Sequence, residues 1–328
     1  MKHSSQRRKL VLSAALGALV LPTAWAQKPK FPNRVVKMVV PSTPGGGPDF
    51  VGRLVAQMLS VKWGQSIIVE NLAGASMQLG TNSVVKAMPD GHTVLFTPPT
   101  PITIANFFEP KPPYEVNKDL VTAGLMGRNP ALIVINSQVK ANTMKEFIAL
   151  AKKEKLFYAS PGQGHAFQLT TEIICTKAGI HMTHVPYKGS SPAVMGLIGG
   201  EVQFLVQSTE AVKEHIKSGR LRALATLENT RLEAFPDAPT LAESGLENLG
   251  IMNWYGLFMP IATPKDILEF WESELQALSK DPGFRKKMFD MSFDPVFYGT
   301  QDFLSIMQKE RMQWRDVIAS TQVQTKKE

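Results

Sequence analysis

Short apolar runs alternate along this chain with segments in which apolar residues recur at helical spacing. The runs predict strands over 35–40, 66–70, 93–96, 131–135, 157–159, 183–185, 204–206 and 221–226. The periodic segments predict helices over 49–62, 78–88, 143–153, 166–178, 191–198, 211–218, 264–280 and 301–320. Such alternation is typical of parallel sheets covered by helices. Two sets of these units predict two lobes, with a ligand between them at the carboxyl ends of the strands.

The first 26 residues have the pattern of a bacterial export signal. Basic residues within 2–9 precede an apolar stretch over 10–21, and Ala24-Trp25-Ala26 supplies an A-x-A cleavage signal. The apolar stretch is short for a membrane span. We therefore expect cleavage before Gln27 and a periplasmic mature protein. The two adjacent arginines fit twin-arginine export as well as they fit ordinary Sec export.

Length, charge and cysteine content limit the classes of protein to which the mature chain can belong. Removing 26 residues from 328 leaves 302, which fits two domains or one large domain. The signal carries four basic and no acidic residues, so the formal charge of +8 falls to +4. No Lys/Arg cluster is dense enough to indicate a nucleic-acid partner. The single cysteine, Cys175, excludes an intrachain disulfide, and its helical surroundings predict a small buried residue rather than a nucleophile.

A glycine-rich turn, Pro41-Ser42-Thr43-Pro44-Gly45-Gly46-Gly47-Pro48-Asp49, joins the first predicted strand to the first predicted helix. Glycines let backbone approach a ligand closely, and free N–H groups at a helix start favour an anion. The turn has no Lys and lacks the G-x-G-x-x-G spacing, so neither a P-loop nor a dinucleotide fold is indicated. The turn is thus either an anion site or a plain tight turn.

A second turn of the same kind, Ser160-Pro161-Gly162-Gln163-Gly164-His165-Ala166, follows another strand and opens another helix. Two helix starts facing one cleft would clamp a carboxylate between backbone N–H groups. A third segment, 70–80, leaves its strand through small residues. Its Ser76 is either a ligand contact or a helix cap.

Motifs for catalysis or metal binding are not found. The chain has no G-x-S-x-G elbow and no H-E-x-x-H pair, and its spacing yields no nucleophile with a base. His181 and His184 are three apart, but on a strand such side chains face opposite sides, and no third zinc ligand lies nearby. We therefore expect no enzyme activity, no cofactor and no metal.

Several ordered segments, from about residue 31 to the C-terminus, share the spacing of a known family. The most specific is His184-Val185-Pro186-Tyr187-Lys188-Gly189, followed by Pro192-Ala193 and 197–200. Others are 39–49, 69–80, 89–91, 219–225, 235–240 and 254–257. Together they resemble the periplasmic solute-binding proteins of tripartite tricarboxylate transporters, also called Bug-type receptors.

The resemblance implies an α/β, two-lobed periplasmic binding protein (type II, Venus-flytrap), each lobe a mostly parallel sheet flanked by helices. Such a receptor closes on a small carboxylate and delivers it to membrane permease subunits. We expect a signal peptide over 1–26, a first lobe over 27–128 plus 259–328, and a second lobe over 129–258. The alternatives are a periplasmic enzyme acting on a carboxylate and a ligand-sensing receptor for a sensor kinase.

Departures from the family pattern bear on the ligand. An Asp often stands where this chain has Gln207, and its loss argues against a cationic amino acid. Phe167 and His165 would suit a flat apolar body. An aromatic carboxylate such as terephthalate is therefore favoured, with an aliphatic di- or tricarboxylate almost equally supported. The candidate ligand-binding residues are Ser42, Thr43, Gly45, Gly46, Gly47, Asp49, Ser76, Ser160, Gly162, Gly164, His165, Ala166, Phe167 and Gln207.

Overall fold

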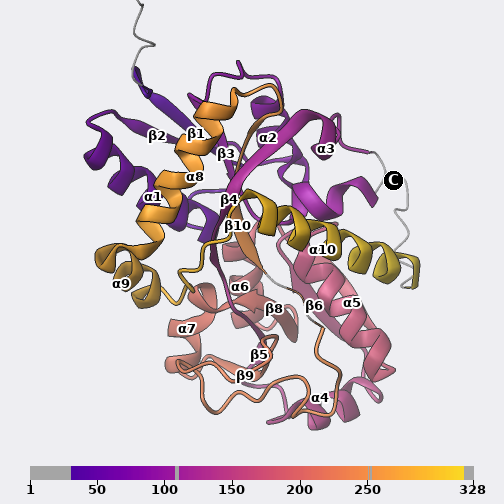
Figure 1. The fold of residues 1–328 in the computed structure, drawn as a ribbon. Helices are drawn as coiled ribbons and strands as arrows, with labels where there is room; N and C mark the ends of the chain where they lie inside the picture. The colour runs from indigo at the N-terminus through magenta and orange to yellow at the C-terminus, as the bar shows by residue number, and fades with distance from the viewer. Residues whose placement is uncertain (1–30, 108–110, 250, 252, 321–328) are drawn as a thin grey trace, which may run out of the picture. The chain divides into compact units, whose positions relative to one another are not determined.

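The computed structural model describes residues 31–107, 111–249, 251 and 253–320 (Figure 1). The predicted signal peptide and its cleavage site before Gln27 lie outside these residues. From Arg34 onward the chain forms one compact unit, which contains two five-stranded sheets. Among the described residues, no helix combines the length and the apolar character needed to cross a membrane.

The first sheet has the strand order β2-β1-β3-β10-β4. Strand β1 (Val36–Val40) pairs in parallel with β2 (Ile67–Asn71) and β3 (Thr93–Thr97). Strand β10 (Trp254–Pro260) is antiparallel to both β3 and β4 (Leu120–Arg128). Four strands therefore run one way and β10 runs against them. The near-continuous apolar sequence of β1 fits a central strand that is buried on both faces.

Helices from both ends of the chain cover the first sheet. Helix α1 (Gly47–Trp63) is capped by Gly64, whose left-handed backbone (φ +65°) lets its N–H bond the Ser60 carbonyl. Trp63 at this end packs edge-on against Trp271, with ring centroids 4.9 Å apart. This contact joins the first helix of the chain to a helix from its C-terminal part. The helices are α1 (Gly47–Trp63), α2 (Gln78–Val85), α3 (Val116–Asp119), α8 (Lys265–Lys280), α9 (Pro282–Asp290) and α10 (Thr300–Ser320).

The second sheet has the order β7-β6-β8-β5-β9. Here β5 alone is antiparallel to its neighbours β8 and β9, while β6 pairs in parallel with β7 and β8. The strands are β5 (Ala131–Asn136), β6 (Leu156–Ser160), β7 (Met182–Pro186), β8 (Phe204–Ser208) and β9 (Leu221–Thr226). The helices are α4 (Met144–Ala151), α5 (Ala166–Ala178), α6 (Ser190–Ile198) and α7 (Thr209–Lys217). The predicted architecture of two lobes with mostly parallel sheets is confirmed.

Two strands and two helices differ from the sequence prediction. Strands β4 and β10 and helices α3 and α9 were not expected. Because β10 pairs within the first sheet, residues 254–258 belong with that sheet. In β4, Gly124 (φ +126°) interrupts the apolar run, and a Cβ there would lie 2.7 Å from the Tyr298 carbonyl oxygen. The close approach of that backbone requires glycine.

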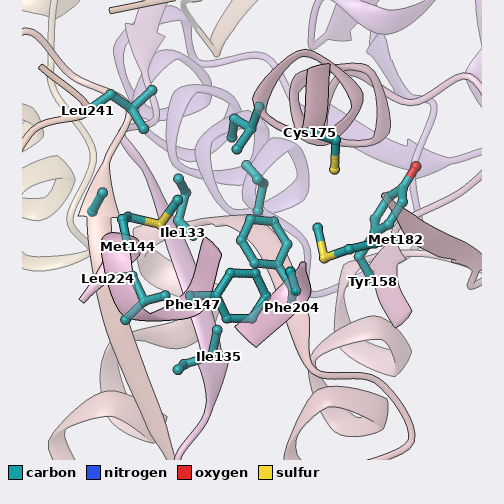
Figure 2. Packing of buried hydrophobic residues seen from close by; sticks show 14 of the residues in the cluster. Ile133, Ile135, Met144, Phe147, Tyr158, Cys175, Met182, Phe204, Leu224 and Leu241 are labelled. Atoms are coloured by element: carbon teal, nitrogen blue, oxygen red, sulfur yellow. The ribbon is translucent and has the colours of Figure 1, made fainter. Parts of the chain in front are cut away.

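An aromatic core fills one face of the second sheet (Figure 2). Phe147 of α4 and Phe204 of β8 pack with ring centroids 5.1 Å apart, and neither is exposed to solvent. Cys175 of α5 is buried beside Met182 in the same cluster. Burial raises the pKa of its thiol to about 12, which keeps it protonated and inert. Cys175 is thus the small buried residue that was predicted.

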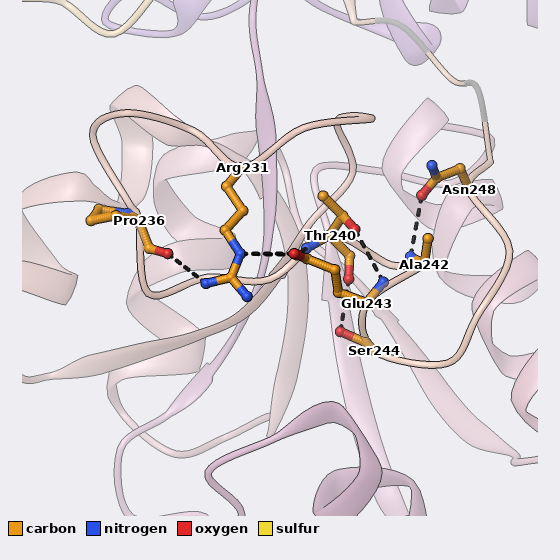
Figure 3. Close-up of polar contacts among 7 residues, drawn as sticks. All are labelled: Arg231, Pro236, Thr240, Ala242, Glu243, Ser244 and Asn248. Carbon is orange, nitrogen blue, oxygen red and sulfur yellow. Dashed lines mark hydrogen bonds and ion pairs between the residues drawn. The ribbon is translucent and has the colours of Figure 1, made fainter.

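Polar contacts hold the irregular segment that follows β9 (Figure 3). Arg231 Nε donates to a carboxylate oxygen of Glu243 at 2.9 Å, and its Nη1 donates to the Pro236 carbonyl at 2.9 Å. The same carboxylate accepts the Thr240 N–H, while Thr240 Oγ1 accepts the Glu243 N–H. These bonds fix a loop whose Leu241 packs into the core of the second sheet.

Candidate functional site

A cavity of about 530 Å³ lies at the carboxyl ends of parallel strands from both sheets. The segments that follow β1, β2 and β3 form one side, and those that follow β6, β7 and β8 form the other. The sequence predicted a site at this edge. The predicted residues that line it are Ser42, Thr43, Gly46, Gly47, Ser76, Gly162, His165, Phe167 and Gln207.

The first turn brings the start of α1 to the cavity wall. Gly46 is the N-cap, with extended backbone and no capping side chain, and its carbonyl accepts the Asp49 and Phe50 N–H groups. Gly47 is buried, and a Cβ there would lie 2.3 Å from the Tyr255 hydroxyl and 2.9 Å from Glu210 Oε1. Only glycine fits at this contact. Gly45, at φ +83°, lies outside the lining and shapes the turn.

Asp49, predicted as a ligand contact, lies outside the cavity lining and stabilises the turn instead. Its Oδ2 accepts the Gly45 N–H at 3.0 Å, and its Oδ1 accepts from Asn71 Nδ2 and lies 2.9 Å from Arg53 Nε. Burial raises the pKa of this carboxyl, but the contacts with Arg53, Gly45 and Asn71 outweigh it and leave the pKa below its ordinary value. A carboxylate with its partners already in place has little capacity left for a ligand.

The second turn brings the start of α5 to the same cavity. His165 is the N-cap, and its Nδ1 accepts the Phe167 N–H at 3.1 Å. The rings of His165 and Phe167 stand 5.2 Å apart between centroids, tilted by 50°. Both line the cavity, so this wall is aromatic.

Three predicted residues of the second turn lie behind the wall. The Gly164 N–H donates to Gln168 Oε1 at 2.6 Å, and Ser160 Oγ donates to the Gly162 carbonyl at 2.9 Å. Ser160 Oγ also lies 2.7 Å from His184 Nε2. Ser160, Gly164 and Ala166 are absent from the lining and shape the turn rather than its surface.

His165 at the start of α5 and His184 of β7, which contacts Ser160 of this turn, are both neutral at pH 7. Burial lowers the pKa of His165 to about 4 and that of His184 to about 4. Desolvation disfavours the charged imidazolium, and no carboxylate of the described residues compensates for it. The second turn therefore offers a ligand hydrogen bonds and ring faces without a formal charge.

Ser76 contacts the opposite lobe from the segment Ala75–Met77. Its Oγ donates to the Gln163 carbonyl of the second turn at 2.7 Å. Ala75, Ser76 and Met77 all have positive φ (45°, 49° and 74°), which is costly for residues with a Cβ. This strained backbone lies in the cavity wall and contacts the second turn.

Sequence analysis missed Glu210, Tyr255 and Lys188, which also line the cavity. The Tyr255 hydroxyl accepts from Asn129 Nδ2 at 2.8 Å, and burial raises its pKa. Burial likewise raises the pKa of Glu210, which follows β8 in the first turn of α7. Lys188 and Tyr255 fall within segments that carry the family resemblance, so a signal for them existed. No signal in the sequence marks Glu210, because acidic residues are common in the first turn of a helix.

Metal ligation finds no support among the residues that the structure describes. They contain no group of three or more His, Cys, Asp or Glu side chains placed to hold an ion. His184 instead stacks on Tyr158, with ring centroids 4.9 Å apart.

Two sheets of matching strand order, with a cavity where their strands end, define a two-lobed solute-binding protein. A family model described as the tripartite tricarboxylate transporter family receptor matches residues 51–323. The chain belongs to this family, as the sequence resemblance predicted. The family is one of transport receptors rather than enzymes.

Known relatives agree with this assignment. BugT of Bordetella pertussis is 31% identical over 294 residues, covering 89% of this chain and 90% of that protein. A solved R. palustris protein with adipate is similar at a TM-score of 0.85 and 27% identity, covering 89% of this chain and 98% of the other. MatC from Rhodopseudomonas palustris with bound malate is similar at a TM-score of 0.80 and 26% identity, covering 88% and 100%.

Proposed function

We propose that the protein is exported to the periplasm, loses its signal peptide before Gln27, and captures a small carboxylate that it delivers to a tripartite tricarboxylate-type permease. The observation that carries the proposal is the meeting of two glycine-rich turns, each the start of a long helix, at one cavity. The positive end of a helix dipole favours an anion at a helix start of this kind.

The favoured ligand is an aromatic carboxylate such as terephthalate. Phe167 and His165 give the cavity an aromatic wall with a tilted geometry that a third ring can join. An uncharged His165 removes the competing attraction of an imidazolium for a second anion. At this wall, a flat apolar group on the ligand should therefore increase affinity more than an additional charge.

An aliphatic dicarboxylate is the second candidate. Two similar solved structures contain adipate and malate respectively, and both proteins share this fold along nearly their whole length. Lys188 in the cavity wall supplies one positive charge that would suit a second carboxylate.

Calorimetric titration of the purified protein with terephthalate, benzoate, adipate, malate and citrate separates the candidates. A ligand at 100 times its Kd also adds about 2.7 kcal/mol of stability, which a thermal shift detects. We expect terephthalate to bind tightest and Phe167→Leu to weaken aromatic acids about 2- to 10-fold more than aliphatic ones. Phe289→Leu, at an exposed ring outside the cavity, is the control.

The outcomes are distinct. Tighter binding of citrate than of every aromatic acid would retain the receptor and discard the aromatic ligand. If no acid binds, the proposal that the two turns hold a carboxylate is wrong. Delivery to a permease is tested by uptake of the identified acid in cells that lack this protein, with and without the gene restored.

A further inference from the structure

Gln207, Ser208 and Glu210 form a polar cluster in the cavity wall that the two turns do not explain. Gln207 lies near the end of β8 and is 0% exposed, while Ser208 is the N-cap of α7. Ser208 Oγ lies between the other two side chains, 3.1 Å from Gln207 Oε1 and 2.6 Å from Glu210 Oε1.

The hydrogen bonds fix which atoms of this cluster remain available. Gln207 Oε1 accepts the Ser208 backbone N–H at 2.9 Å, so the other end of its amide is the NH2 group. That Nε2 is buried and, among the described residues, has no partner. Glu210 Oε2 is likewise buried without a partner in the described part of the chain. Unpaired buried groups are rare in proteins and call for an explanation.

Glu210 Oε2 is an acceptor in either protonation state. Ser208 Oγ has one proton but faces two acceptor oxygens, so it serves both only if a proton on Glu210 Oε1 is donated back to it. Burial raises the pKa of Glu210 and favours this neutral form. In that form Oε2 is a carbonyl oxygen, and in the charged form it is a carboxylate oxygen.

We propose that Gln207 and Glu210 recognise a hydroxyl group on the bound carboxylate. This inference rests on the proposed function and adds that, of two acids with the same aromatic or aliphatic body, the hydroxylated one binds tighter. A hydroxyl donates to Glu210 Oε2 and accepts from Gln207 Nε2, so it satisfies both atoms. A carboxylate can only accept and would leave Oε2 unpaired, and an ammonium can only donate and would leave Nε2 unpaired. The cluster thus discriminates between acids that differ by one hydroxyl.

Matched pairs of acids test this proposal by calorimetric titration. The pairs are benzoate with 4-hydroxybenzoate and succinate with malate, so that the hydroxyl is presented on both an aromatic and an aliphatic body. We expect the hydroxylated member of at least one pair to bind about 10- to 100-fold tighter, because an acid without it leaves buried polar atoms unpaired. The ratio should approach one in Glu210→Met and in Gln207→Met, each of which removes one of the two atoms.

Glu214→Met is the matched control. Glu214 lies one turn further along α7, is exposed and pairs with Lys217, so its loss should leave the ratio unchanged. Melting curves of each variant show whether it is folded. Equal binding of the two members in both pairs by the unmodified protein, or a ratio that persists in both cavity variants, would overturn the hydroxyl inference alone. Binding of no acid at all would overturn the proposed function and this inference with it.

Discussion

The two turns at the cavity occupy matching places in their sheets but are stabilised in different ways. The first turn depends on a charged group, Asp49, which binds Gly45, Asn71 and Arg53. The second depends on neutral groups: Gln168 accepts the Gly164 N–H, and Ser160 contacts His184. One fold position can therefore be stabilised by ionic or by neutral contacts, and the two solutions should respond differently to pH and to substitution.

The same contrast extends to the glycines. Gly47 of the first turn is required by space, because a Cβ would meet the Tyr255 hydroxyl at 2.3 Å. Gly164 of the second turn has φ +72°, so the backbone conformation itself favours glycine. The first turn thus packs closely against β10 of its own sheet, whereas the second is shaped mainly from within.

Acid should destabilise the second turn first, and this is the largest effect we expect. The folded-state pKa values of His165 and His184, about 4, lie below the ordinary 6.5, so the unfolded chain binds more protons as the pH falls. The contribution is complete above about pH 6.5 and is lost progressively towards pH 4, by at most about 3 kcal/mol for each ring. The lowered pKa of Asp49 confines its own loss to more acidic solution, below its ordinary value of 3.8.

Urea denaturation of the protein at pH 7, 5.5 and 4.5 measures this difference. His184→Gln should reduce the fall in unfolding free energy over that range, whereas His181→Gln, at an exposed position, should leave it unchanged. An identical fall in the wild type and in His184→Gln would show that the ring is not buried as described.

Asp49→Ala should destabilise the protein more than Gln168→Ala. The first change leaves the Gly45 N–H without an acceptor, removes one of the two acceptors of Asn71 Nδ2 and takes the ion pair from Arg53, at a cost of about 3 kcal/mol. The second leaves only the Gly164 N–H unpaired, at about 1–2 kcal/mol. Urea denaturation at pH 7 compares the two, and equal losses would contradict the view that the first turn alone depends on charge.

Gly47→Ala should weaken stability and ligand binding while Gly46→Ala is tolerated. The first methyl group would overlap Tyr255 and Glu210, and overpacking of this kind costs about 1–3 kcal/mol. The second would lie 3.7 Å from its nearest neighbours, an ordinary contact. Melting temperature and calorimetric titration of the two variants test this. Equal behaviour would show that the Tyr255 hydroxyl moves aside at little cost.

Local pattern was enough to predict the strands and helices around both turns, because each apolar run and each periodic segment is continuous in sequence. It failed for β4 and β10. Gly124 and Gly127 break the apolar run of β4, and Gly256 breaks that of β10. The placement of Asp49 behind the wall and of Glu210 within it arises from packing between distant segments, on which the spacing of residues carries no information.

Ser76→Ala should have the smallest effect of these changes, and it tests the contact between the two lobes. The substitution removes the hydrogen bond from Ser76 Oγ to the Gln163 carbonyl, worth about 0.5–1 kcal/mol at an exposed site. If Ser76 keeps its hydrogen bond to the second turn when the ligand is bound, the bond stabilises the bound state. Its loss should then lower the affinity about 2- to 5-fold with little change in melting temperature.

Ser83→Ala is the control, since it removes a hydrogen bond of the same length, 2.7 Å, within α2. A loss of affinity in both variants would attribute the effect to α2 rather than to the contact across the cavity. Unchanged affinity in Ser76→Ala would show that the strained segment reaches the second turn without stabilising the bound state.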